Sequence, residues 1–84
     1  MTPDPGEVYG RILADMKMIW GEMASAMLRK RLRDVSADAA RLTADQLRAV
    51  VHLLEEKTLP SVLGPEGAEL KARLWMSWVG NGQA

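Results

Sequence analysis

The sequence has no cysteine and no phenylalanine, and it contains a single histidine. Without cysteine, neither a disulfide scaffold nor a thiolate metal site can form. A catalytic or metal-binding histidine needs companion ligands, and the spacing around His52 identifies none. The neighbouring Glu55 and Glu56 point about 100° apart on a helix, so they do not form a catalytic carboxylate pair. We therefore expect a protein that is not an enzyme and that uses no cofactor or metal.

Excess charge and long apolar runs are also absent. Lysine plus arginine number 11 and aspartate plus glutamate number 11, so the formal net charge is zero, whereas nucleic-acid binders usually carry a basic excess. The longest strongly apolar runs, AVV and LWM, are far shorter than the ~20 residues of a membrane span. The first ten residues are acidic and proline-containing, unlike a signal peptide. We expect a cytoplasmic protein that does not associate with membranes.

What the sequence does contain is helical periodicity. Hydrophobic residues make up 48% of the 84 residues and charged residues 26%, a composition typical of a globular chain. No segment alternates with the period of a strand. We predict an all-α helical bundle in one domain over 1–84, with a flexible leader over 1–5 and a flexible tail over 80–84.

The first predicted helix is long. From Val8 to Met27, ten apolar residues fall within an arc of about 140° when each residue advances 100°. Asp4 is placed to cap this helix, with Pro5 at its first position. The pattern predicts a helix over about 6–34, although the apolar stripe shifts at Leu28.

Three shorter elements follow. Asp34, Ser36 and Asp38 interrupt the pattern, and a short helical turn is expected over 37–41. Thr43 followed by Gln46 forms a capping box and predicts a helix over 44–57. A last helix is predicted over 65–79, beginning at Pro65.

The length of the first helix indicates that the bundle is completed by oligomerisation. An unbroken helix over 6–34 would be ~42 Å long at 1.5 Å per residue, and the two later helices would cover only half of it. A second copy in a two-fold dimer would cover the remainder. The alternative is that the helix breaks at Gly21 and its halves fold on each other in a four-helix monomer.

Methionine and tryptophan suggest where contacts with partners lie. The chain has six methionines and three tryptophans, residues that are enriched at protein interfaces but also fill cores. We expect Trp20 to be buried at the centre of the first helical face. The candidate interface with a second copy or a helical protein partner is Ile12, Met16, Ile19, Trp20, Met23, Met27, Trp75 and Trp78.

A basic cluster raises nucleic acid as an alternative partner. Four of the five residues over 29–33 are basic, but on a helix these cations radiate in different directions, and Asp34 is placed to pair with Lys30. Residues 36–56 faintly resemble a helix-turn-helix, with Asp45 facing the phosphates. The alternative function is a small DNA-binding regulatory protein that uses Arg29, Lys30, Arg31, Arg33, Arg41 and Arg48.

Overall fold

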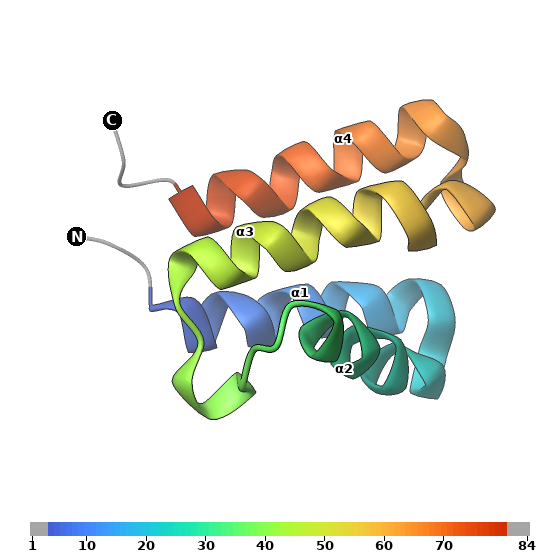
Figure 1. The fold of residues 1–84 in the computed structure, drawn as a ribbon. Helices are drawn as coiled ribbons and strands as arrows, with labels where there is room; N and C mark the ends of the chain where they lie inside the picture. The colour runs from blue at the N-terminus through green and yellow to red at the C-terminus, as the bar shows by residue number, and fades with distance from the viewer. Residues whose placement is uncertain (1–3, 81–84) are drawn as a thin grey trace.

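The fold is described from a computed structural model, which covers residues 4–80. Within this range the chain is helical and has no strand, so the all-α class is confirmed. The main helices, drawn in Figure 1, are α1 (Pro5–Trp20), α2 (Ala24–Asp34), α3 (Ala44–Leu53) and α4 (Pro60–Gly80). Short 3₁₀ turns occupy Gly21–Met23 and Ala39–Arg41, and a π-helical turn occupies Leu54–Thr58.

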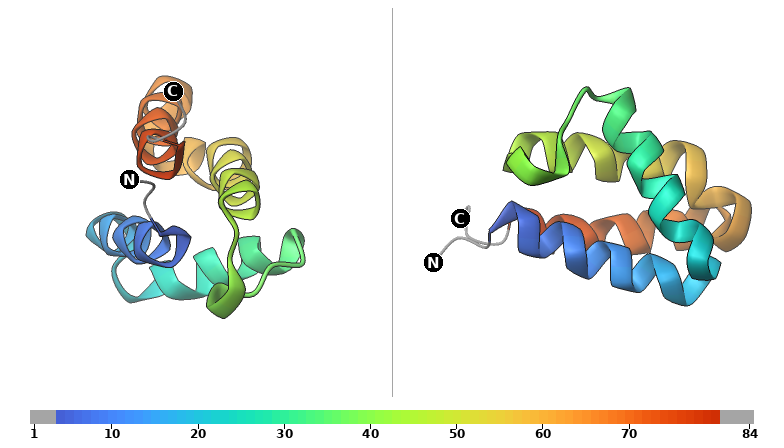
Figure 2. Two further views of the ribbon diagram at one scale, coloured as in Figure 1. Left: turned by 90° about the vertical axis from the view of Figure 1, so that its left-hand side faces the viewer. Right: turned by 90° about the horizontal axis from the view of Figure 1, so that it is seen from below.

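The helices enclose one core. α3 and α4 run antiparallel beside each other, α1 lies along the pair, and α2 crosses obliquely beneath (Figures 1 and 2). The molecule measures 33 × 25 × 20 Å. Its buried apolar side chains come from all four helices, and Trp75 is the largest of them.

The expected single helix over 6–34 is wrong, because it breaks at Gly21. Gly21 has φ 64° and ψ −136°, a conformation that side chains strongly disfavour. The chain turns there, and α2 folds back against α1 (Figure 1). The uncovered helix length that suggested a second copy therefore disappears, and the dimer stays a prediction.

The buried stripes of the two helices explain the break. α1 buries Val8, Ile12 and Met16, and α2 buries three residues at the same spacing, Ala24, Leu28 and Leu32. If the helix were continuous, the centres of these stripes would lie about 160° apart around its axis. They can face the same core only because the chain changes direction between them.

The other element boundaries follow local signals. α1 begins at Pro5, its predicted first position, and the Asp4 carboxylate accepts a hydrogen bond from the backbone N–H of Glu7 at 3.2 Å. The predicted capping box of α3 is confirmed, with reciprocal hydrogen bonds of 3.1 Å between Thr43 and Gln46. The predicted turn over 37–41 is a 3₁₀ turn over Ala39–Arg41.

The helix predicted over 44–57 continues through α3 into the π-helical turn, which ends at Thr58. Pro60 explains this wide turn, because a proline ring clashes with the carbonyl four residues before it in a regular α-helix. Within α4, Gly64 has φ 74° and breaks the helix, so the segment that begins at Pro65 corresponds to the helix predicted over 65–79. Residues 1–3 of the expected leader and 81–84 of the expected tail lie outside the described residues.

Gly21 and Gly10 provide a matched test of the turn. An added Cβ would meet no atom within 4 Å at either position, but only Gly21 has a positive φ. Gly21→Ala should therefore destabilise the fold by about 1–3 kcal/mol through backbone strain alone. Gly10→Ala, within regular α1, should instead stabilise it by about 0.5–1 kcal/mol. Urea denaturation followed by circular dichroism measures both changes, and equal effects at the two positions would contradict the role of Gly21.

Candidate functional site

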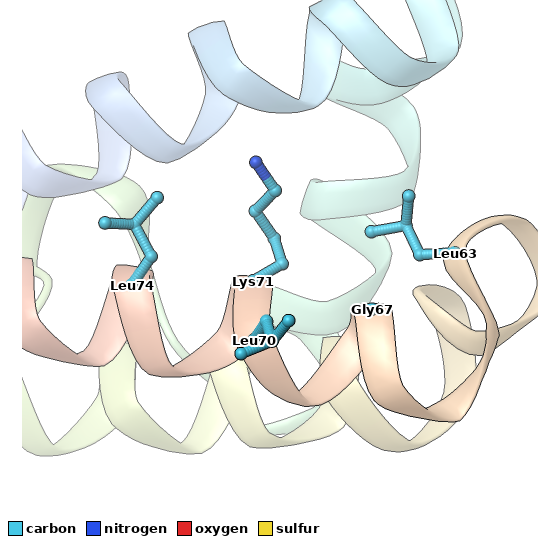
Figure 3. A pocket seen from close by; sticks show the side chains of 5 residues that line it. All are labelled: Leu63, Gly67, Leu70, Lys71 and Leu74. Atoms are coloured by element: carbon cyan, nitrogen blue, oxygen red, sulfur yellow. The ribbon is translucent and has the colours of Figure 1, made fainter.

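A shallow apolar groove lies on the surface of α4, on the side toward α1. Figure 3 shows Leu63, Lys71 and Leu74 extending from α4 toward α1, with Gly67 and Leu70 on the same stretch of α4. The groove is open to solvent, has a volume of about 360 Å³, and is lined by α4 residues alone, Leu63, Gly67, Leu70, Lys71 and Leu74. Leu70 is 65% exposed and Leu74 is 43% exposed, although both are large apolar side chains.

The exposure of these leucines follows from how α4 packs. Ala68, Ala72, Trp75 and Val79 form the buried stripe of α4 at helical spacing. Leu70 and Leu74 form a second apolar stripe about 150° around the helix from the first, and α1 covers only one flank of that stripe. The helix therefore has more apolar surface than the other helices of the chain cover.

Asp15 holds α1 against α4 beside the groove. Its carboxylate Oδ2 accepts hydrogen bonds from the indole Nε1 of Trp75 at 2.8 Å and from the Nζ of Lys71 at 3.1 Å. Because Trp75 is fully buried, its N–H needs this acceptor. The only charged side chain that lines the groove, Lys71, is therefore already paired.

A second contact between the same helices lies toward the end of α4. The guanidinium of Arg11 stacks over the ring of Trp78, with its central carbon 4.3 Å from the ring centroid. Such cation–π contacts at exposed sites contribute roughly 0.5–1 kcal/mol. Arg11 thus covers part of the Trp78 ring, which is half-buried.

The groove offers no constellation of catalytic groups. Four of its five lining residues carry no polar side-chain atom. Within residues 4–80, no group of three or more histidine, cysteine, aspartate or glutamate side chains is placed to hold a metal ion. The single histidine, His52, is exposed and lies 3.4 Å from Glu56 on the same helical surface.

The candidate interface residues divide into three groups. Ile12, Met16 and Trp75 are buried in the core, so they cannot contact a partner while this fold is intact. Ile19, Trp20, Met27 and Trp78 are half-buried, and Met23 is exposed. Trp20 was expected to be buried, but it is only half-buried. Trp75 occupies the centre of the core instead.

Sequence reasoning did not identify Leu63, Leu70 and Leu74 as a surface. The signal was present, since Leu70, Leu74 and Trp78 lie on one line of the last helix and Ala68, Ala72 and Trp75 lie on another. One helix with two apolar lines has more apolar surface than one neighbour can cover. The sequence alone does not indicate which line is left open.

The basic cluster does not converge. Arg31 donates to Asp34 at 2.7 Å, so Asp34 pairs with Arg31 and not with Lys30 as expected. Arg48 donates to Asp45 at 2.7 Å. Arg29, Lys30, Arg33 and Arg41 are exposed. Two of the six candidate nucleic-acid contacts are thus neutralised by acids of the same chain.

The resemblance to a helix-turn-helix is also weak in the structure. The segment before α3 is only a three-residue 3₁₀ turn, too short to brace a recognition helix as a first helix does. Thr43 and Gln46, which such a helix would present to bases, instead bond to each other's backbone.

Tyr9 has a shifted pKa, at a distance from the groove. Burial raises the pKa of the Tyr9 phenol above its ordinary value of 10.0, and the positive charge of Arg29 offsets part of that change. The interaction lies between α1 and α2, so it reports on their packing and not on the groove.

Comparisons of the chain with models of known protein families, with curated proteins and with solved structures found no match. Within residues 4–80, none of the helices combines the length and apolar character that crossing a membrane requires.

The tie at Asp15 can be tested by two substitutions. Asp15→Ala leaves the buried indole N–H of Trp75 without an acceptor, which should cost about 1–3 kcal/mol of unfolding free energy. Asp15→Asn keeps an acceptor oxygen and loses only the charge, so its cost should be clearly smaller. Urea denaturation of both variants measures this order, and equal losses for the two variants would show that the ion pair with Lys71, which both substitutions remove, matters more than the acceptor for Trp75.

Proposed function

We propose that this chain is a non-enzymatic cytoplasmic protein that acts by helix-mediated self-association. The contact surface is the groove lined by Leu63, Leu70 and Leu74. The same surface is suited to an amphipathic helix of another protein, because helix-in-groove recognition uses apolar anchors at this kind of spacing.

The observation that carries the proposal is the clustering of exposed apolar side chains along one groove. Single exposed leucines are ordinary on protein surfaces, whereas contiguous apolar patches indicate binding. Leu70 and Leu74 line the groove from α4. On α1, the 85%-exposed Met18 lies one turn beyond Asp15, on the side of the helix that faces α4.

The chemistry of the groove favours a helix over a small polar ligand. Its volume of about 360 Å³ is at the lower end for ligand sites, which combine an apolar lining with a few convergent polar groups. Here Lys71 is the one charged group, and it is bound to Asp15. An apolar side chain from a partner helix needs no polar contact with the residues that line the groove.

DNA binding remains the alternative, and it is less well supported. Its case rests on Arg29, Lys30, Arg33 and Arg41, which are exposed. The pairing of Arg31 and Arg48 with acids and the zero net charge both weaken it.

Self-association predicts a mass that depends on concentration. The monomer mass is 9.3 kDa, and multi-angle light scattering should show a rise toward twice that value between low micromolar and about 1 mM, the range of weak complexes. Leu70→Asp places a charge in the apolar contact and should hold the protein at the monomer mass. Because Leu70 is largely exposed, the variant should keep its helical circular dichroism. A mass of 9.3 kDa for the unmodified protein throughout would contradict self-association.

The DNA alternative is tested separately. We expect no tight complex with labelled duplex or single-stranded oligonucleotides at ~50 mM salt, where contacts with phosphates are strongest. Submicromolar binding would favour the alternative if it weakened steeply at ~200 mM salt. That binding should also be lost when Arg29, Lys30 and Arg33 are changed to glutamine.

A further inference from the structure

We propose that the groove is occupied by α4 of a second copy of this chain, running antiparallel to the first about a two-fold axis near residues 68 and 69. This inference rests on the self-association proposed above and specifies its geometry. In this register, Leu70 of each copy packs against Leu63 and Gly67 of the other, and Glu66 of each copy faces Arg73 of the other.

The spacing of the surface residues fits helix pairing. Leu63, Gly67, Leu70, Leu74 and Ser77 follow one another at intervals of four, three, four and three residues. This is the spacing of a coiled-coil seam, in which one face of a helix packs against a second helix. Leu63 precedes the break at Gly64, yet it still lines the same groove as Gly67 and Leu70.

The surface can pair with itself. Leu70 projects into solvent, and three residues earlier the side chain of Leu63 fills the space beside Gly67, since a Cβ on Gly67 would come within 2.9 Å of the Cβ of Leu63. A two-fold interface brings the same patch of both copies together, so Leu70 of each copy can pack against Leu63 and Gly67 of the other.

The charges beside the groove have the same symmetry. Glu66 and Arg73 flank the seam, each directly before one of its residues, Gly67 and Leu74. An antiparallel pair places Glu66 opposite Arg73 of the second copy, twice by symmetry. Both residues are exposed, and Arg73 already lies 2.9 Å from Glu69 in its own chain, so the contact would extend an ion-pair network.

A parallel pair fits the same surface less well. It would direct Glu66 toward Lys71 of the second copy, whose side chain is only 26% exposed and is bound to Asp15 on the side of α1. The antiparallel arrangement directs Glu66 toward Arg73 instead, whose side chain is 73% exposed and pairs only with Glu69 at the surface.

Exchange of the two charges tests the register. Arg73→Glu sets glutamates against each other, and Glu66→Arg sets arginines against each other, so each variant alone should self-associate roughly tenfold more weakly. An equimolar mixture of the two variants brings opposite charges together at both positions. Native mass spectrometry of that mixture should show a heterodimer, and the double variant E66R/R73E should again form a homodimer. Arg33→Glu, the same charge change on α2, serves as the matched control and should leave the dimer unchanged.

The outcomes separate the two proposals. A heterodimer together with rescue in the double variant would support the antiparallel register. A dimeric unmodified protein whose charge variants associate as it does, or whose mixture gives no heterodimer, would overturn the register while self-association stands. An unmodified protein that is monomeric throughout would remove both. Circular dichroism of each variant confirms that Arg73→Glu, which also loses the contact with Glu69, is still folded.

Discussion

The reversal of the chain at Gly21 is the constraint on which the rest of this structure depends. The buried stripes of α1 and α2 would face nearly opposite directions on a continuous helix, and the positive φ of Gly21 lets both reach one core. Because α2 folds back, it packs against α1 and crosses obliquely toward α3 (Figure 2). The flank of α1 that carries Asp15 is thereby left to face α4.

The contact on that flank is narrow, and this is why a groove exists. Asp15 meets Trp75 and Lys71 on α4, while Leu70 and Leu74 stay 65% and 43% exposed. A buried indole N–H requires an acceptor, so the position of Trp75 also determines where α1 approaches α4. Asp15 thus satisfies the buried indole N–H of Trp75 and also pairs with Lys71, the one charged side chain that lines the groove. The other residues that line the groove are apolar.

Local signals were enough to predict α3 and the second part of α4, but the break at Gly21 needed tertiary information. Thr43 with Gln46 and Pro65 mark helix starts through hydrogen bonding and backbone geometry that involve only neighbours. Glycine within an apolar helical pattern is only mildly unfavourable, so Gly21 was compatible with either structure. The shift of the stripe at Leu28 was the available clue. Trp20 was expected at the centre of a long helical face. Because the chain reverses just after Trp20, the centre of the core is occupied by Trp75 instead.

The candidate groove was less predictable than the fold, because its exposure is a property of the packed chain. The core is complete without the groove, since the buried stripes of all four helices meet inside one copy. Folding depends on buried residues such as Trp75 and Ile12, whereas the self-association proposed above would depend on Leu70 and Leu74. These two sets of residues are separate in this chain. Its association would then be set by concentration, and the surface that mediates it can change without loss of the core.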